Sequence, residues 1–337
     1  MSSSDQALRA DRSTRLAKTQ AFAFCLIGIV LMFVINGALI SGLRRLHNGD
    51  FGVWNALVAG DINADVLVIG ASRALVDVDC EVVTKRLAQS CFDIGLDGSA
   101  YNLQQPLLET YLAHNRPPRI AIVSADIASL SNAREAYHPQ QYLPYLDQPQ
   151  VYERLKSLDP TLWWKQRYLP LYGFAHHGLS LTISAVQGLI KSPDSAAPTR
   201  VRGHLAVDLS WDGSFDNFMR EVGDRGKIFP VEPAAIAHVA AMIRELRAGG
   251  AQVAIFYSPE WREMHRFELN RSEVLSSYRT VATSNGAVFL DYSDSPLSFD
   301  RSYFYNSQHM NRRGAILFSQ VLSSDLAVLA TRGAPTP

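Results

Sequence analysis

The sequence predicts an α/β protein: a three-layer α/β/α sandwich on a five-stranded parallel sheet, preceded by one N-terminal transmembrane helix. After residue 60, short and continuous apolar segments alternate with segments of helical spacing. Apolar strands joined by helices are typical of a parallel sheet that is covered on both faces. A charge-free apolar segment precedes this alternation and predicts the transmembrane helix.

The charge-free segment runs from Ala21 to Leu43, which suits a membrane-spanning helix of about 20 apolar residues. A cleavable signal peptide is the competing interpretation. Its apolar stretch would be shorter and would end in a small-residue cleavage site, and no such site follows Leu43. We therefore favour an uncleaved transmembrane anchor (21–43) after an N-terminal tail (1–20).

The charges that flank the segment predict its orientation. More basic residues precede the segment than follow it: Arg9, Arg12, Arg15 and Lys18 before, Arg44 and Arg45 after. The positive-inside rule places the N-terminus in the cytoplasm and residues 46–337 outside. In a bacterial cell, this means a single pass through the inner membrane with the main domain in the periplasm or on the outer face.

We expect a linker (44–60), one domain (61–330) and a C-terminal tail (331–337). The first half of the domain has strands and helices in alternation: strand 64–72, helix 78–89, strand 91–98, helix 101–115 and strand 117–127. The second half continues the pattern: helix 233–250, strand 251–259, helix 262–285, strand 287–293 and helix 311–330. A glycine pair ends helix 233–250, as is common at helix C-termini.

The alternation stops at about 129–230, a stretch rich in Trp, Tyr and Pro that contains Trp163, Trp164 and Trp211. We interpret it as an insertion after the third strand and not as a separate domain. It would either pack over the edge of the sheet or form a lid or substrate groove. Aromatic side chains suit sugar rings and membranes alike, so the sequence leaves its role open.

Composition excludes some classes of function. The chain carries 32 Lys+Arg and 32 Asp+Glu, so its formal net charge is zero. A nucleic-acid-binding protein normally presents a basic face, and we therefore expect no nucleic-acid partner. Motifs for metal or nucleotide binding are absent from the sequence, so no metal and no cofactor is expected. A continuous helix from 79 to 90 would separate Cys80 from Cys91 by about 16 Å, too far for a disulfide. Both are expected to be buried thiols.

Ligands of open α/β sheets bind beyond the carboxyl ends of the strands, so the residues after each strand are the candidates for chemistry. Ser72 stands in a Gly-Ala-Ser turn between a strand and a helix and could act as a nucleophile. His309 precedes the last helix and could remove its proton. Gly98 and Asn102 follow the second strand, where they could donate hydrogen bonds to an oxyanion.

Three sequence blocks resemble those of the SGNH (GDSL-like) hydrolase superfamily: VLVIGASRALVDVD, FDIGLDGSAYN and FYNSQHMNRRGA. More narrowly, they look like the membrane-anchored branch that includes DltD-like and alginate-acetylation-type proteins. The resemblance covers roughly 60–128 and 233–330, and it implies an SGNH/flavodoxin-like sandwich. It also implies that Ser72 is the nucleophile, Gly98 an oxyanion-hole donor and His309 the base.

Three positions depart from the pattern of the superfamily. Ala71 replaces the acid of the first block, as also happens in the anchored branch. Asp126 stands where an oxyanion-stabilising Asn is expected, and Asn102 is a candidate substitute. Asn306 stands where the aspartate of the catalytic triad is expected.

The amide of Asn306 could orient the imidazole of His309 through its oxygen, but it would not neutralise an imidazolium. In serine proteases the Asp-to-Asn change costs about 10⁴ in turnover. A backbone carbonyl, Asp294, Asp300 or Asp126 could take over the task. Alternatively, the protein is no longer a catalyst.

The resemblance implies a membrane-anchored acyltransferase that acetylates a hydroxyl of a cell-surface polysaccharide or exopolysaccharide through a serine acyl-enzyme. An acyl-exporting membrane protein would be its partner. Two alternatives are a carbohydrate esterase with the same residues and a non-catalytic scaffold that binds polysaccharide or an assembly partner.

Overall fold

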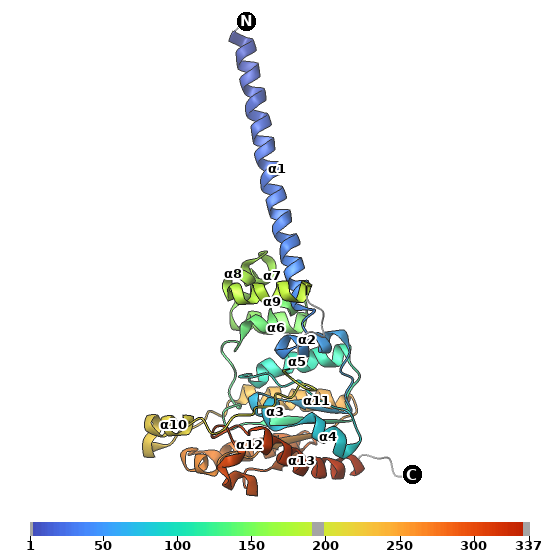
Figure 1. Cartoon of the computed structure of the whole chain (residues 1–337), viewed down its shortest axis with the longest axis vertical. Helices are drawn as coiled ribbons and strands as arrows, with labels where there is room; N and C mark the ends of the chain where they lie inside the picture. Colours follow the sequence, from blue (N-terminus) through green and yellow to red (C-terminus); the bar gives the residue numbers. More distant parts are fainter. Residues whose placement is uncertain (1–2, 191–198, 333–337) are drawn as a thin grey trace.

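The computed structural model describes residues 3–190 and 199–332. A long helix, α1 (Ser3–Leu43), projects from one end of an α/β domain (Figure 1). The tail expected at 1–20 belongs to this helix from Ser3 onward. Of the tail expected at 331–337, residues 333–337 lie outside the described part of the chain, and residues 331 and 332 end the last helix.

The domain contains a five-stranded sheet with the order β2-β1-β3-β4-β5, and all neighbouring strands are parallel. Its strands are β1 (Val66–Ile69), β2 (Cys91–Asp93), β3 (Ile120–Ala125), β4 (Gln252–Tyr257) and β5 (Val288–Asp291). The predicted fold class is confirmed. The chain reverses its direction across the sheet between β1 and β3, and the carboxyl ends of these two strands form the switch point where α/β proteins bind ligands.

Alternate side chains of the strands enter two hydrophobic cores, one on each face. Leu67 and Ile69 lie in one core, and Val66 and Val68 in the other. The first core is closed by α5 (Tyr101–His114), α11 (Pro233–Ala248) and α12 (Arg271–Ser284). The second is closed by α3 (Ser72–Asp77), α4 (Cys80–Leu87) and α13 (Arg312–Arg332). The three layers therefore follow from the period of two in the strands.

The segment expected to be a linker is largely helical. Within 44–60, helix α2 (Gly49–Ala59) buries Val53, Trp54 and Leu57 against the domain. The indole of Trp54 stacks on Tyr145 with ring centroids 5.0 Å apart. The connection between α1 and the sheet is therefore part of the packed domain.

The prediction of two free thiols is wrong: Cys80 and Cys91 form a disulfide, with their Cα atoms 5.1 Å apart. The estimate assumed a continuous helix to residue 90, but α4 ends at Leu87. Ala88 takes a left-handed conformation with φ 52° and reverses the chain. Cys91 thereby returns to the start of α4, where Asp79 caps the helix by accepting from two backbone N–H groups.

The aromatic-rich insertion contains short helices in two groups. Helices α6 to α9 lie at the end of the domain from which α1 projects, and α10 (Ser214–Val222) lies away from them (Figure 1). The first group comprises α6 (Pro149–Leu158), α7 (Pro160–Tyr168), α8 (Tyr172–His177) and α9 (Leu179–Ile190). The insertion therefore packs at two places: at the foot of α1, and against Met264 and Phe267 after β4, where Phe215 of α10 is buried.

Two of the described helices are long and apolar enough to cross a membrane. In α1 the span is Thr14–Leu43, and its most apolar window is not buried in the domain, whereas Leu39 and Leu43 at its C-terminal end are buried. The other span, Arg312–Thr331 in α13, is 44% buried and covers the second core, as expected for a helix of a folded domain. Only α1 presents its apolar side chains all round.

Candidate active site

The nucleophile candidate stands in a tight turn between β1 and α3. Gly70 is needed there, because a Cβ at this position would lie 2.5 Å from the Cβ of Ser124 and 2.8 Å from that of Ala74. The N–H of Leu75 donates to the Ala71 carbonyl at 3.1 Å and closes the first helical turn. Ser72 is thus held at the carboxyl edge of the sheet with its side chain partly exposed.

His309 reaches this serine from the loop before α13. Its Nε2 lies 2.7 Å from Ser72 Oγ. Two contacts hold the loop: the N–H of Tyr305 donates to the His309 carbonyl at 3.2 Å, and the N–H of Met310 donates to Asp77 Oδ1 at 2.9 Å. The ring of Tyr305 stacks on the imidazole, with centroids 5.6 Å apart.

Asn306 occupies the position of the third triad member. Its Oδ1 lies 3.0 Å from His309 Nδ1 and also accepts from the N–H groups of Gln308 and His309, at 3.0 and 2.9 Å. A backbone N–H can only donate, so the amide atom that faces these groups must be the oxygen. The imidazole must then carry its proton on Nδ1, which leaves Nε2 free to accept from the Ser72 hydroxyl.

Asn306 therefore fixes the tautomer that a base needs, although it has no charge. The other candidates for this task lie elsewhere. Asp294 pairs with Arg262, and Asp300 accepts from the N–H of Ser302. The alternative of a backbone carbonyl is also unused, because His309 Nδ1 is bonded to the asparagine itself.

The electrostatic surroundings disfavour the charged form of His309. Burial and, to a lesser extent, the nearby Arg73 guanidinium lower its pKa from 6.5 to about 4, while Asp97 and Asp212 act in the opposite direction. The imidazole is therefore neutral at neutral pH and ready to accept a proton. It is a weak base, because an imidazolium here has no adjacent carboxylate.

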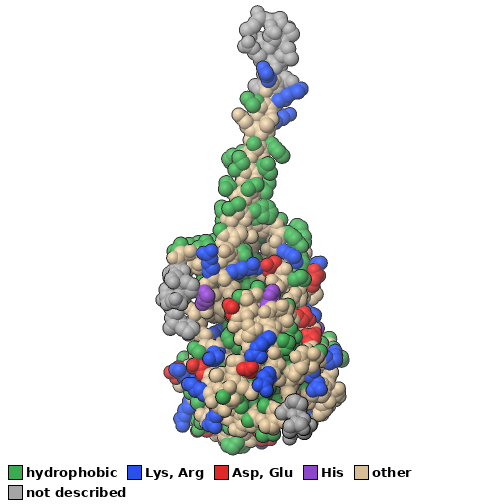
Figure 2. Space-filling model, turned by 90° about the vertical axis from the view of Figure 1, so that its right-hand side faces the viewer, with side chains coloured by type: hydrophobic (Ala, Val, Ile, Leu, Met, Phe, Trp, Pro, Cys, Tyr) green, Lys and Arg blue, Asp and Glu red, His purple; other side chains and the backbone are tan. Residues whose placement is uncertain are grey.

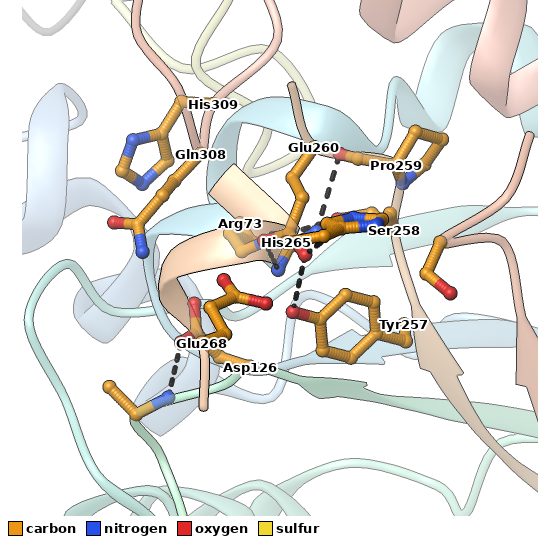
Figure 3. A network of polar contacts seen from close by, with 12 residues as sticks. Arg73, Asp126, Tyr257, Ser258, Pro259, Glu260, His265, Glu268, Gln308 and His309 are labelled. Carbon is orange, nitrogen blue, oxygen red and sulfur yellow. Dashed lines mark hydrogen bonds and ion pairs between the residues drawn. The ribbon is translucent and has the colours of Figure 1, made fainter. Parts of the chain in front are cut away.

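Directly after the nucleophile, Arg73 is fully buried in a cluster of charged and polar groups (Figure 3). Its Nη1 lies 3.3 Å from Glu260 Oε2, and its Nε lies 3.8 Å from Asp77 Oδ2. Nε also donates to Ser258 Oγ at 3.0 Å, and the guanidinium lies over the ring of Tyr257. One cation thus serves two buried carboxylates.

The two carboxylates respond differently to this shared partner. Burial would raise the pKa of Glu260, but Arg73, His265 and Arg271 together hold it at about 2. For Asp77, burial outweighs the attraction of Arg73 and raises the pKa to about 7. The guanidinium charge is thus balanced mainly by Glu260.

Asp77 links three elements of the site. Its Oδ2 accepts from Ser258 Oγ at 2.6 Å at the end of β4, and its Oδ1 accepts from the N–H of Met310 next to the base. Since Asp77 also ends α3, it connects the nucleophile's helix with the histidine loop. Sequence reasoning missed Arg73, Asp77 and Glu260. The available signal was a charged pair four residues apart, directly after the candidate serine.

Gly98 lies on the loop after β2, beside the nucleophile's turn. The N–H of Leu96 and the hydroxyl of Ser99 both reach the Gly70 carbonyl, at 3.0 and 3.4 Å. Within residues 3–190 and 199–332, no acceptor binds the N–H of Gly98 or that of Ser72. Gly98 has φ +61°, and a Cβ there would meet the ring of Tyr137 at 2.4 Å. Both N–H groups remain available as donors.

Asn102 and Asp126 have other tasks than those expected. The Asn102 amide is buried and committed at both ends to Ala133, donating at 2.9 Å and accepting at 3.0 Å. Asp126 Oδ1 accepts from the N–H of Ala128 at 2.8 Å. Burial raises the pKa of Asp126, opposed by Arg73. Only the protonated form of Asp126 would offer a donor. Asn102 is not placed as the substitute donor, because both ends of its amide are bonded to Ala133.

In the described part of the chain, no group of three His, Cys, Asp or Glu side chains is placed to hold a metal ion. What the arrangement can do is acid–base and nucleophilic chemistry at Ser72.

Comparisons with known proteins give no family for this chain. No family model and no curated protein matches it significantly. Among solved structures it is similar to Est24, a carbohydrate acetylesterase from Sinorhizobium meliloti. The match has 12% sequence identity and a TM-score of 0.35, and it covers 78% of this chain and 98% of that chain. At this level the comparison carries no argument about activity, which has to come from the residues themselves.

Proposed function

We propose that this protein is a membrane-anchored, extracytoplasmic acyltransferase that works through a serine acyl-enzyme. The observation that carries the proposal is the hydrogen bond of 2.7 Å between Ser72 Oγ and His309 Nε2, with Nδ1 oriented by Asn306 Oδ1. Nucleophilic catalysis by a serine requires a base within hydrogen-bond distance of its hydroxyl and a third group that orients the base. The arrangement supports an SGNH-type reaction without a charged third member.

In the first step, Ser72 Oγ attacks the carbonyl carbon of an acyl donor while its proton passes to His309 Nε2. The oxygen of the tetrahedral intermediate would be held by the N–H groups of Ser72 and Gly98. When the intermediate collapses, the bond to the leaving group breaks and the leaving group takes the proton from His309. The product is an ester on Ser72.

In the second step, the hydroxyl of an acceptor gives its proton to His309 Nε2 and attacks the ester carbon. Collapse returns the proton to Ser72 Oγ and releases the acylated acceptor. We propose acetyl as the acyl group and a cell-surface polysaccharide or exopolysaccharide as the acceptor. If water is the acceptor, the protein is a carbohydrate esterase, which is the second candidate function. The partial exposure of Ser72 and His309 supports this candidate, because it gives water access to the ester.

Two observations support a location outside the cytoplasm. Helix α1 has the length and apolarity of a membrane span, and the domain contains the Cys80–Cys91 disulfide. Disulfides persist in oxidising compartments such as the bacterial periplasm and are rare in the cytosol. We propose a single pass through the inner membrane with the N-terminus in the cytoplasm and an acyl-exporting membrane protein as the source of acyl groups.

The test offers purified protein p-nitrophenyl acetate, with water alone or with an acetyl-free oligosaccharide as the acceptor. We expect release of p-nitrophenol that depends on Ser72, and a product distribution that distinguishes transfer from hydrolysis. Ser72→Ala is the control, because it removes only the nucleophilic oxygen. If folded protein releases p-nitrophenol no faster than Ser72→Ala does, the enzyme hypothesis fails and a binding scaffold becomes the better account.

A further inference from the structure

Helix α9 is apolar on two opposite faces. One face, formed by Leu181, Ala185 and Gly188, is buried. It packs so closely on α1 that a Cβ at Gly188 would lie 2.0 Å from the carbonyl oxygen of Gly42. The opposite face carries four branched aliphatic side chains that are between 41% and 75% exposed: Leu179, Ile183, Val186 and Ile190. We call these four residues the α9 stripe.

The spacing of the α9 stripe is that of one helix face. Its members recur at intervals of four, three and four residues, which keeps them in line at 3.6 residues per turn. No side chain of the described residues covers them enough to bury them. A soluble surface rarely exposes a continuous aliphatic row of this kind, so the stripe indicates an apolar surrounding.

Helix α1 is attached to the domain rigidly. The N–H of Leu171, just before α8, donates to Asn36 Oδ1 in α1 at 2.9 Å. Further along, Arg44 Nε donates to the Pro144 carbonyl at 3.0 Å, and its Nη2 lies 2.6 Å from Asp147 Oδ2. Because no free linker separates α1 from the domain, the depth of α1 in a bilayer would set the height of the insertion above it.

The length of the exposed part of α1 places the insertion at the membrane boundary. The large apolar side chains of α1 from Phe22 to Ile35 are between 39% and 78% exposed, and they cover about 20 Å at 1.5 Å per residue. The hydrocarbon core of a bilayer is about 30 Å thick. The remaining length has to come from the next turns of α1, near Ile40, where Asn36 already contacts the insertion and α9 begins to cover the helix.

Charge and position agree with this placement. Arg44 and Arg45 follow at the foot of α1, where cations can meet lipid headgroups. Figure 1 shows α7, α8 and α9 around the foot of α1, and Figure 2 shows apolar side chains along α1 and on the adjoining end of the domain. The apolar side chains of α1 and those of the α9 stripe therefore lie at the same end of the domain.

We infer that the α9 stripe docks on the lipid bilayer, lying in the interfacial layer of the leaflet from which the domain emerges. This inference rests on the part of the proposed function that makes α1 a membrane anchor. An interfacial helix buries its apolar face at the boundary between headgroups and acyl chains. The domain is then held in one orientation by α1 and α9 together, and its site stays at a fixed height above the lipid.

The test uses the full-length protein in phosphatidylcholine vesicles, with Cys25→Ser so that an introduced cysteine is the only free thiol. The variant Ile183→Cys is labelled with the environment-sensitive fluorophore NBD. Val321→Cys is the matched control, because Val321 is 46% exposed and Ile183 is 48% exposed, and α13 lies at the end of the domain remote from α1 (Figure 1). Leu179→Cys provides a second position on the stripe.

We expect blue-shifted NBD emission, and quenching by lipid with a doxyl group near the headgroup, at Ile183→Cys and Leu179→Cys but not at Val321→Cys. Water-like emission at both stripe positions overturns the inference, as does equal quenching at all three. Emission that shifts only after membrane proteins are added assigns the stripe to a protein partner and also overturns it. Flotation with the vesicles tests whether α1 anchors the protein in the membrane, and labelling of Ser72 by a fluorophosphonate tests whether the active site is functional. A failure of docking is thereby distinguished from a failure of the proposed function.

Discussion

Replacing Asn306 by Asp tests how the site works without a charged third member. The change is nearly isosteric, and a carboxylate can accept the same three hydrogen bonds from His309 Nδ1 and the two backbone N–H groups. It adds one negative charge next to the imidazole and otherwise leaves the loop as it is. We therefore expect a change in electrostatics without a change in geometry.

The magnitude follows from the distance between the two groups. Unit charges 3.0 Å apart interact by about 5.5 kcal/mol at an effective dielectric constant of about 20. Both side chains are only half-buried, and the new carboxylate loses solvation, so we expect about half of this energy. Since 1.36 kcal/mol corresponds to one pKa unit, the pKa of His309 should rise by about 2, from its present value of about 4.

The assay is the pH dependence of kcat/KM for p-nitrophenyl acetate. His309 acts as a base only when it is neutral, so activity is lost as the pH falls through its pKa. We expect this loss near pH 4 in the unchanged protein and about 2 units higher in Asn306→Asp. At neutral pH the variant should be about 10- to 100-fold faster, because the imidazolium formed in the transition state is stabilised by up to about 2.7 kcal/mol.

Asn306→Ala is the control for orientation, because it removes the acceptor that fixes the tautomer. We expect it to lower kcat/KM by more than about 10-fold without unfolding the domain. If Asn306→Asp changed neither the rate nor the pH dependence, another group would already neutralise the imidazolium. The reasoning on a neutral third member would then be wrong.

Two further predictions concern stability, measured by urea unfolding. Arg73→Met should lower the unfolding free energy by about 3–5 kcal/mol, because it removes the cation that Glu260 and Asp77 share in the protein interior; a loss below about 1 kcal/mol would show that Arg271 and His265 balance Glu260 without Arg73. Replacing Cys80 and Cys91 together by Ala should cost about 3 kcal/mol, the loop entropy of a closed segment of about 11 residues. Free-thiol titration of the unfolded, unreduced protein should find one reactive cysteine, and three would refute the disulfide.

The strands and the serine–histidine pair could be predicted from the sequence because both depend on local pattern. Short apolar segments give buried strands, and parallel strands bring their carboxyl ends to one edge of the sheet. Ser72 follows the first strand and His309 precedes the last helix, so the topology places them near each other. The structure puts their Oγ and Nε2 atoms 2.7 Å apart.

Features that depend on single backbone conformations were not predictable in the same way. Ala88 reverses the chain with φ 52°, a conformation for which glycine is the usual signal, and so the disulfide was missed. Which end of the Asn306 amide faces His309 is decided by the N–H groups of the loop, which the sequence does not orient. Arg73 was passed over because arginine is almost never fully buried unless it is paired.

The central claim is that Ser72 forms a covalent ester, and peptide mapping by mass spectrometry after a brief incubation with p-nitrophenyl acetate tests it most directly. The account predicts an acetyl group on the peptide that contains Ser72, with much less in His309→Ala and none in Ser72→Ala. Folded protein that carries no acetyl group, or carries it at the same level in Ser72→Ala, would contradict the account.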